Sequence, residues 1–318
     1  AHSVEANFLY MQQAPDFRAA FVSPRTRNTI TPNLTTEKVL SFDAAYSFKA
    51  PWLQLRASVY YTTIKDQSKL ISFYDDVWAA FSNMSLSGID SRYYGLELGF
   101  KIPIVADLSL SGAASIGDYT YTSNPYFTQT RDNTATTLVE NARVYWKGMK
   151  VESTPQTAIN VGLNLRAPKN WYASIDFNFY DRLYLSMNPM YRTQYLAQEI
   201  MKIYDFQNLE SGRQKQYVVD IIDGIRAQEE LGNAYTLSAS IGKNWNIKYR
   251  YTLGFSLQVN NILNCRTIRT GGYEQMRLNK ISDPIIFPND KGELIILKKP
   301  TTYSRFDSKY FYMNGLNY

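Results

Sequence analysis

Histidine and cysteine are nearly absent from this chain. Its 318 residues include one histidine, His2, and one cysteine, Cys265. A single cysteine cannot form a disulfide within the chain, and these two residues are too few for a zinc site built from Cys and His ligands. A Ser-His-Asp or Cys-His catalytic site would have to use His2, beside the first residue. We therefore expect no enzyme activity, no metal site and no cofactor.

Long apolar runs are missing as well. No segment approaches the run of about 18 or more apolar residues that a membrane-spanning helix needs, and the mean hydropathy is −0.34. These values do not exclude a transmembrane β-barrel. The strands of a barrel alternate lipid-facing with lumen-facing residues, so their mean hydropathy resembles that of a soluble protein.

Clusters of one charge are also rare, although the net charge is +6. The densest basic groups are residues 147–150 and the pair Lys298 and Lys299. Neither group is interleaved with the aromatic residues of a nucleic-acid-binding module. Solvated loops explain these groups better, and we expect no nucleic-acid partner.

The dominant feature of the sequence is an alternation of apolar and other residues with period two. Successive side chains of a strand point to opposite faces of a sheet, so this pattern predicts strands with one apolar face. The pattern is clear in eight segments: residues 40–49, 53–62, 94–102, 108–117, 159–166, 171–180, 235–242 and 251–260. Two partial strands are predicted at residues 5–11 and 309–318.

The connections between these strands fall into two classes. Turns of a few residues alternate with loops of about 25 to 55 residues, as in outer-membrane barrels, whose periplasmic turns are short and whose extracellular loops are long. Each strand has about 10 residues, enough to cross a bilayer at a tilt. The sequence therefore predicts an all-β fold, an antiparallel transmembrane β-barrel with about ten strands in this chain. A soluble β-sandwich is the alternative, but it does not explain the one-sided loop lengths.

The two faces of the predicted strands differ in polarity. Charged residues on the polar face would be very costly in a sandwich core, whereas a hydrated lumen accommodates them. The predicted lumen-facing charges are Asp43, Arg56, Glu97, Arg166 and Asp176. The apolar face would contact outer-membrane lipid, with girdles of aromatic residues near the strand ends. These aromatic residues are Trp52, Tyr61, Tyr94, Trp171, Tyr235 and Tyr251.

The long loops carry the candidate substrate contacts. Aromatic side chains in loops can stack on a ligand, or they can pack one loop against another. The candidates are Phe73, Tyr74, Trp78, Phe81, Tyr126, Tyr145 and Trp146, of which the first four lie in a predicted loop at 65–92.

Two other loops carry local structure of their own. Apolar residues recur at helical spacing over residues 195–206 and 216–231, and Gly232 is a plausible helix stop. This loop is predicted to be a small helical hairpin, which is either structural or a lid that grips a ligand or a partner. Residues 283–299 are predicted to form a short β-ribbon around a turn at 288–292.

Several segments resemble one known family. They are residues 8–21, residues 33–46, the run Val259-Asn260-Asn261-Ile262-Leu263-Asn264, residues 271–275 and residues 304–312. In order and spacing they resemble the barrels of TonB-dependent receptors, particularly those of Bacteroidetes-type bacteria. The resemblance implies that residues 1–318 form the C-terminal part of a barrel of about 22 strands, roughly strands thirteen to twenty-two. The plug domain and the TonB-contacting peptide do not appear, and both ends are expected to continue in a longer polypeptide.

The resemblance also implies a function. Such a receptor lies in the outer membrane of a Gram-negative bacterium and takes up a large or scarce nutrient, such as siderophore-bound iron, a glycan or a peptide, with energy from TonB. The expected partners are TonB, through the missing N-terminal region, the extracellular substrate and a surface lipoprotein. The alternatives are an autonomous small porin and a barrel enzyme. The scarcity of histidine opposes the enzyme, and the expected continuation of both ends opposes the porin.

Overall fold

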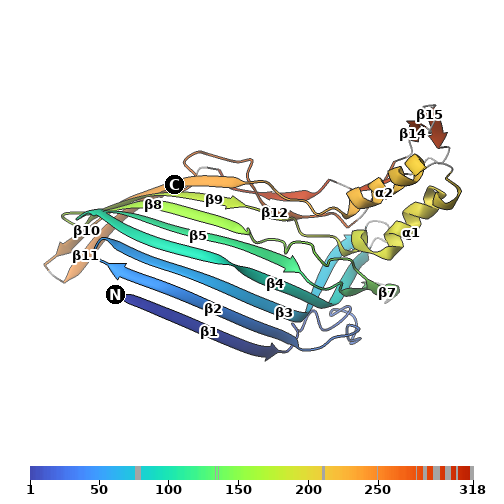
Figure 1. Ribbon diagram of the computed structural model, residues 1–318, viewed down its shortest axis with the longest axis horizontal. Helices are drawn as coiled ribbons and strands as arrows, with labels where there is room; N and C mark the ends of the chain where they lie inside the picture. The colour runs from blue at the N-terminus through green and yellow to red at the C-terminus, as the bar shows by residue number, and fades with distance from the viewer. Residues whose placement is uncertain are drawn as a thin grey trace.

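An open antiparallel sheet of 11 strands forms the body of the protein in the computed structural model (Figure 1). The structure describes residues 1–75, 80–132, 134, 136–209, 212–248, 250–276, 278–281, 285–288, 294–297, 302–305 and 307–315. The main path of the sheet is β1 (His2–Gln13), β2 (Glu37–Ala50), β3 (Leu53–Asp75), β4 (Ala80–Val105), β5 (Leu108–Tyr121), β8 (Thr157–Ala167), β9 (Trp171–Asp181), β10 (Ala234–Ile247) and β11 (Tyr251–Val259). β6 (Tyr126–Arg131) pairs with β4, and β7 (Thr137–Arg143) pairs with β6.

The remaining elements belong to the loops. The helical ones are η1 (Pro189–Arg192), α1 (Gln194–Ile203), η2 (Phe206–Asn208) and α2 (Gly212–Arg226). Three two-stranded ribbons pair β12 (Arg269–Tyr273) with β17 (Lys309–Tyr312), β13 (Leu278–Ile281) with β16 (Thr302–Arg305), and β14 (Ile285–Pro288) with β15 (Leu294–Leu297). No helix in the described part of the chain is long and apolar enough to cross a membrane.

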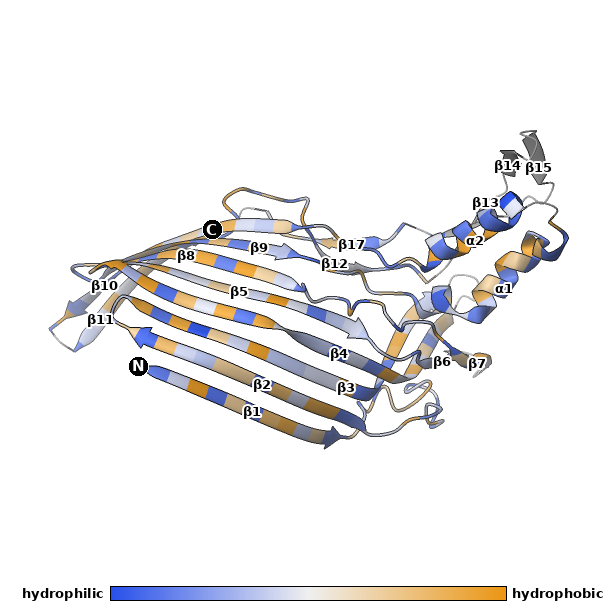
Figure 2. Cartoon of the chain, viewed as in Figure 1, coloured by the Kyte–Doolittle hydropathy of each residue, from blue (hydrophilic) through white to orange (hydrophobic). Residues whose placement is uncertain are grey.

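The all-β fold and the eight predicted strands are confirmed. Each lies in the main path, and hydrophobic and hydrophilic residues alternate along the strands (Figure 2). We call the face that carries Leu96 and Leu98 the apolar face, and the face that carries Glu97 the polar face. Leu96 is 61% exposed and Leu98 is 42% exposed, as expected for a surface that a membrane covers. The sheet does not close, because β1 and β11 each pair on one side only among the described residues.

Very short turns join the strands at one end of the sheet. Ala50 pairs with Leu53, which leaves a loop of Pro51 and Trp52. In the β8–β9 turn, Lys169 and Asn170 have φ angles of 61° and 60°. Such left-handed residues match the turn to the twist of the strands that it joins. The predicted short turns are therefore present.

The prediction of a loop at 65–92 is wrong, because this segment is a long hairpin. β3 and β4 stay paired as far as Asp75 and Ala80. The alternation is interrupted by register shifts between Ile64 and Lys69. Farther along, Asn83, Ser85 and Ser87 are polar but buried, because other segments form hydrogen bonds with them. Ser87 Oγ, for example, donates to the carbonyl of Pro32 at 2.6 Å. On the other face Met84 and Leu86 pack into an apolar core, so only a short alternation remains in the sequence of the hairpin.

The partial strand predicted at 309–318 is present over Lys309–Tyr312, but it is not part of the main sheet, and residues 316–318 lie outside the described residues. Lys309–Tyr312 pairs with β12 in a separate ribbon, through partners such as Phe311 and Gly271. Gly272 lies where an added Cβ would be 2.0 Å from the carbonyl oxygen of Lys309, so the ribbon requires glycine there. The predicted ribbon around residues 288–292 is confirmed by the pairing of Ile285 with Leu297.

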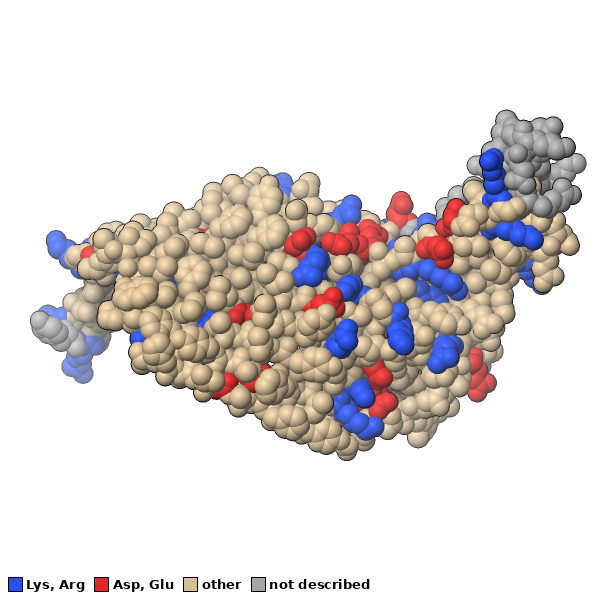
Figure 3. Space-filling model, viewed as in Figure 1, with Lys and Arg blue, Asp and Glu red and all other residues tan. Residues whose placement is uncertain are grey.

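Exposed aromatic residues border the apolar face. At the loop side, Phe8, Phe42, Tyr61 and Tyr94 are successive direct partners across β1 to β4. At the turn side lie Trp52, Trp171 and Tyr251, which are 64%, 40% and 61% exposed. In Figure 3, charged side chains gather toward the helical end of the molecule, and fewer lie over the strands near the turns. An apolar band between aromatic borders matches the lipid-facing surface of a membrane barrel.

Candidate functional site

The loop end of the sheet carries an apolar core of its own. The hairpin extension of β3 and β4 packs with β6, β7 and the segment that follows β7. The core consists of Met84, Leu86, Ile89, Tyr121, Phe127, Ala142, Val144, Trp146 and Met187. This core lies beyond the aromatic row, on the loop side of the sheet. Because its side chains pack together, the loops are ordered and can hold side chains in fixed positions for a ligand.

The predicted helical hairpin is confirmed, with different ends. The side chain of Thr193 accepts a hydrogen bond from Leu196 N at 3.4 Å and caps α1. Apolar residues at helical spacing, including Leu196, Ile200, Val218 and Ile222, form the core between α1 and α2. α2 ends at Arg226, before the predicted Leu231, because the chain there pairs with the segment after β9. Leu231 N donates to Leu183 O at 2.8 Å.

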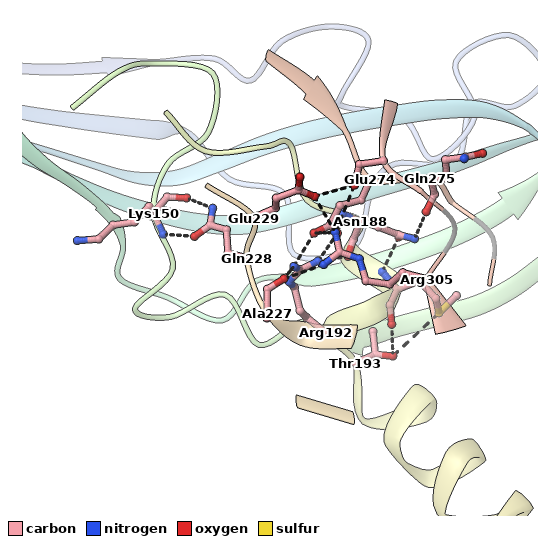
Figure 4. Close-up of polar contacts among 12 residues, drawn as sticks. Lys150, Asn188, Arg192, Thr193, Ala227, Gln228, Glu229, Glu274, Gln275 and Arg305 are labelled. Atoms are coloured by element: carbon pink, nitrogen blue, oxygen red, sulfur yellow. Dashed lines mark hydrogen bonds and ion pairs between the residues drawn. The ribbon is translucent and has the colours of Figure 1, made fainter. Parts of the chain in front are cut away.

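A buried ion pair fixes the base of this hairpin (Figure 4). The side chains of Arg192 and Glu274 are both 0% exposed and pair directly. Arg192 also donates to the carbonyl oxygens of Asn188 at 3.2 Å and Ala227 at 3.0 Å. Glu274 in turn accepts from the backbone N–H of Asn188 at 2.8 Å and pairs with Arg305 at 3.0 Å. A buried pair of charges is stable only with such additional hydrogen bonds.

A second acidic residue extends this cluster toward the β12–β17 ribbon. Glu229 accepts hydrogen bonds from the hydroxyls of Ser308 at 2.9 Å and Tyr310 at 2.5 Å. It also lies 3.6 Å from Arg269 and 3.7 Å from Arg305. The helical hairpin and the ribbon are therefore held together by charges from both loops.

A second buried carboxylate, Glu152, joins the segment after β7 to β3. Glu152 pairs with Lys69 at 2.5 Å and accepts from the hydroxyl of Tyr121 at 2.6 Å. Burial alone would raise the pKa of Glu152, but the charge of Lys69 and these two hydrogen bonds outweigh it and hold the pKa below the usual value. Burial and the carboxylate of Glu152 raise the pKa of Tyr121, so its hydroxyl stays protonated and donates.

Acidification is expected to release this segment from β3. A carboxylate with a lowered pKa stabilises the fold above its unfolded pKa, and this contribution is lost as the pH falls through the folded pKa. We expect the protection factors of backbone amides around Glu152, taken relative to the intrinsic exchange rate at each pH, to fall below about pH 4, and Glu152→Gln to abolish that pH dependence. Glu140→Gln, which removes an exposed carboxylate, is the control and should leave it intact. Equal protection factors at pH 3 and pH 7 in the unaltered protein would contradict this account.

Two of the predicted substrate contacts prove to be structural. Trp146 is 0% exposed and stacks against Tyr121 with ring centroids 5.1 Å apart. The prediction that Trp146 contacts substrate is corrected, because its side chain is fully buried and a ligand cannot reach it. Phe73 is partly buried against the same core. Trp78 lies outside the described residues.

The other four aromatic candidates, Tyr74, Phe81, Tyr126 and Tyr145, have accessible rings. An arginine guanidinium lies over the ring of three of them. The guanidinium of Arg25 lies 5.3 Å from the ring centroid of Phe81, which meets Tyr74 edge-on at 5.5 Å. Arg143 lies 5.7 Å from the ring of Tyr126, and Arg226 lies 5.8 Å from the ring of Tyr145. The sequence did not reveal these arginines, since most of them come from distant segments. Paired aromatic and guanidinium groups can hold ligands that carry rings or anionic groups.

The five charges predicted to face the lumen share the polar face. The strand register places Asp43, Arg56, Glu97, Arg166 and Asp176 there together. Several have polar partners: Asp43 accepts from Asn7 at 2.9 Å, Arg56 donates to Glu5 at 3.1 Å, and Asp176 accepts from Ser174 at 3.0 Å.

A hollow of about 400 Å³ opens on this face between Arg56, Glu97, Asn160 and Tyr180. Within the described ranges, no group of three His, Cys, Asp or Glu side chains could hold a metal ion. The polar face thus presents hydrogen-bonding groups and small hollows.

Solved structures with a similar fold include two siderophore-related receptors. The ferric yersiniabactin uptake receptor FyuA from Yersinia pestis has 14% sequence identity and a TM-score of 0.50, over 86% of this chain and 32% of that one. The siderophore receptor PiuA from Acinetobacter baumannii has 12% identity and a TM-score of 0.50, over 96% of this chain and 32% of that one. The chain thus spans about a third of the length of these receptors. No curated protein matches the sequence significantly.

A protein-family comparison covers nearly the whole chain. The family described as TonB dependent receptor-like, beta-barrel matches residues 6–310. The match includes β1 from Ala6 onward, all the other strands of the main sheet and the loops with their ion pairs. The chain therefore belongs to the TonB dependent receptor-like β-barrel family.

Proposed function

We propose that this chain is the C-terminal part of the barrel of an outer-membrane receptor that imports a large or scarce nutrient with energy from TonB. The observation that carries the proposal is the two-faced sheet, with an apolar band between aromatic borders and all large loops at one end. The family match and the open edges at β1 and β11 support a barrel completed by further strands. The segment resemblance supports the Bacteroidetes-type branch.

In this proposal the polar face is the wall of the lumen. Asp43, Arg56, Glu97, Arg166 and Asp176 then face water, a plug or the passing substrate. Their mutual hydrogen bonds to neighbours such as Asn7 and Ser58 support this placement, because charges turned toward lipid would lack such partners.

The substrate would bind at the loop end, against the accessible aromatic residues. Tyr74, Phe81, Tyr126 and Tyr145 are the proposed contacts, with Arg25, Arg143 and Arg226 beside three of them. This composition suits a substrate that has rings or anionic groups, such as a siderophore, a glycan or a peptide. TonB would act through a plug, and a surface lipoprotein would cover the loops from outside.

Uptake by a deletion strain tests the function. Deletion of the gene is expected to abolish the depletion of one class of compound from a mixed medium, and loss of TonB should produce the same defect because the transport is energised. Restoring the gene with Tyr145→Ala should raise the half-saturating substrate concentration about tenfold, whereas Tyr195→Ala, an exposed ring on α1, serves as the control. Unchanged depletion in the deletion strain, or depletion that persists without TonB, would contradict the proposal.

A further inference from the structure

Three cationic residues lie on the apolar face just beyond its aromatic row. They are Arg92, Lys38 and Lys65. Arg92 is two positions nearer the loops than Tyr94 in the same strand. Lys38 is four positions nearer the loops than Phe42, and Lys65 is four positions nearer than Tyr61. At about 3.3 Å per residue, these cations lie about 7 and 13 Å past the row. This is the level at which a membrane surface would cross the barrel, if the apolar face meets lipid as proposed above.

Lys38 and Lys65 form an unusual pair. They are direct partners in the β2–β3 register, on the same face. Like charges directly opposite each other in a sheet destabilise it, so the pairing needs an anionic partner. Asp66 supplies one for Lys38, at 2.9 Å. Lys65 is exposed and has no ion-pair partner among the described residues.

The third cation is held close to the aromatic row. The guanidinium of Arg92 lies 5.2 Å from the ring centroid of Tyr94. Asp118 lies opposite Tyr94, diagonal to Arg92, and pairs with Lys150 at 2.5 Å. The carboxylates near these cations are Asp66, Asp118 and Asp90, which accepts from Asp66 N at 2.9 Å. Four cations thus face three carboxylates. Lys38 and Lys150 each have an ion-pair partner, whereas no ion pair is formed by Lys65 or Arg92 among the described residues, so the excess positive charge lies at these two.

We propose that Lys65, together with Lys38 and Arg92, binds the phosphate group of an anionic lipid in the outer leaflet. This inference rests on the proposed outer-membrane function. Long cationic side chains beside a lipid-facing surface extend their charge to the head-group level, where they attract anionic lipid. Between the cations and the aromatic row, Tyr10 and Leu40 are 57% and 40% exposed, and they offer an apolar surface to the attached acyl chain. Inorganic phosphate has no acyl chain and would not contact that apolar surface.

Binding of lipid A to the receptor purified from outer membranes in neutral detergent tests the proposal. Lipid A with two phosphates is expected to bind more tightly than the same lipid after its phosphates are removed. Lys65→Gln should weaken binding about fivefold, and the triple change with Lys38→Gln and Arg92→Gln about 100-fold. Lys65→Arg should bind normally, since it keeps the charge.

Two further variants make the test specific. Asp66→Asn should tighten binding about fivefold because it frees Lys38, and asparagine tolerates the φ of 62° at this position. Lys243→Gln is the matched control: Lys243 is an apolar-face cation between Trp171 and Trp245 at the turn end, and its loss should leave binding unchanged.

Several outcomes would overturn the proposal. They are equal binding of dephosphorylated lipid A, equal effects of Lys65→Gln and Lys243→Gln, and equally tight binding of inorganic phosphate, which would indicate a site for free anions. Each variant is also assayed for its recovery in the outer-membrane fraction. If the unaltered protein is not recovered there, the proposed function fails; if it is recovered and binding shows no phosphate dependence, only the lipid site fails.

Discussion

Ala114→Arg is expected to destabilise the barrel by about 2–4 kcal/mol, whereas Ala113→Arg is expected to be tolerated. The two alanines are consecutive in β5 and lie at the same depth. Ala114 pairs with Leu98 and Ile159 on the apolar face, and Ala113 pairs with Gly99 and Asn160 on the polar face. An arginine on the lipid face near the middle of the bilayer has no water and no counter-ion, and this accounts for the cost. At Ala113 the new guanidinium would lie diagonal to Glu97, within reach of its carboxylate.

The measurement is the amount of heat-resistant folded receptor in isolated outer membranes, supported by the free energy of folding into phospholipid vesicles. A large loss for Ala114→Arg alone would establish which face meets lipid. The reverse order, with Ala113→Arg the more damaging change, would mean that the polar face is packed in a protein core, and the membrane interpretation would fall. In a soluble protein, an arginine at a half-exposed alanine usually changes stability by less than about 0.5 kcal/mol.

The strands were predictable because burial in a barrel wall has period two. From Leu53 to Thr62, every second side chain is apolar, since one face meets lipid and the other does not. The same reasoning failed in the extension of β3 and β4. There the sheet continues into the loop assembly, where residues such as Asn83 and Ser87 are buried by polar contacts with segments far away in the sequence. One face of the extension still packs on an apolar core through Met84 and Leu86, but register shifts between Ile64 and Lys69 interrupt the period-two pattern that signals such a face.

The ion pairs of the loops were beyond sequence reasoning for a similar cause. Arg192 and Glu274 are 82 residues apart, and nothing near either residue distinguishes it from a solvated surface charge. The helical hairpin was predictable, because Leu196, Ile200 and Val218 have helical spacing, but its attachment was not. The aromatic candidates divide in the same way: the sequence shows Tyr145 and Trp146 as neighbours, and only the fold shows that Trp146 is buried and Tyr145 is exposed.

Arg192→Met is expected to detach the base of the helical hairpin from the β12–β17 ribbon. Breaking a buried ion pair costs about 3–5 kcal/mol, because the remaining charge is left in the interior. Glu274 would keep Arg305, but it would lose the fully buried partner that also holds the carbonyls of Asn188 and Ala227. Glu274→Gln should act in the same direction, since it leaves Arg192 without a counter-charge.

Hydrogen exchange of the loops measures this effect without unfolding the barrel. We expect exchange at residues 186–193, 227–231 and 272–276 to accelerate about 100-fold or more, while Ile200 and Val218 inside the hairpin keep their protection because the α1–α2 core is separate. Lys202→Met removes an exposed cation from α1 and should change nothing. The double change Arg192→Met with Glu274→Leu should cost less than the sum of the two single changes, because no unpaired charge stays buried. Two outcomes would contradict the account: additive costs of the two changes, and unaltered exchange at residues 272–276 in Arg192→Met. Either would show that apolar contacts hold the hairpin and the ribbon together. The two loops could then move independently when a substrate arrives.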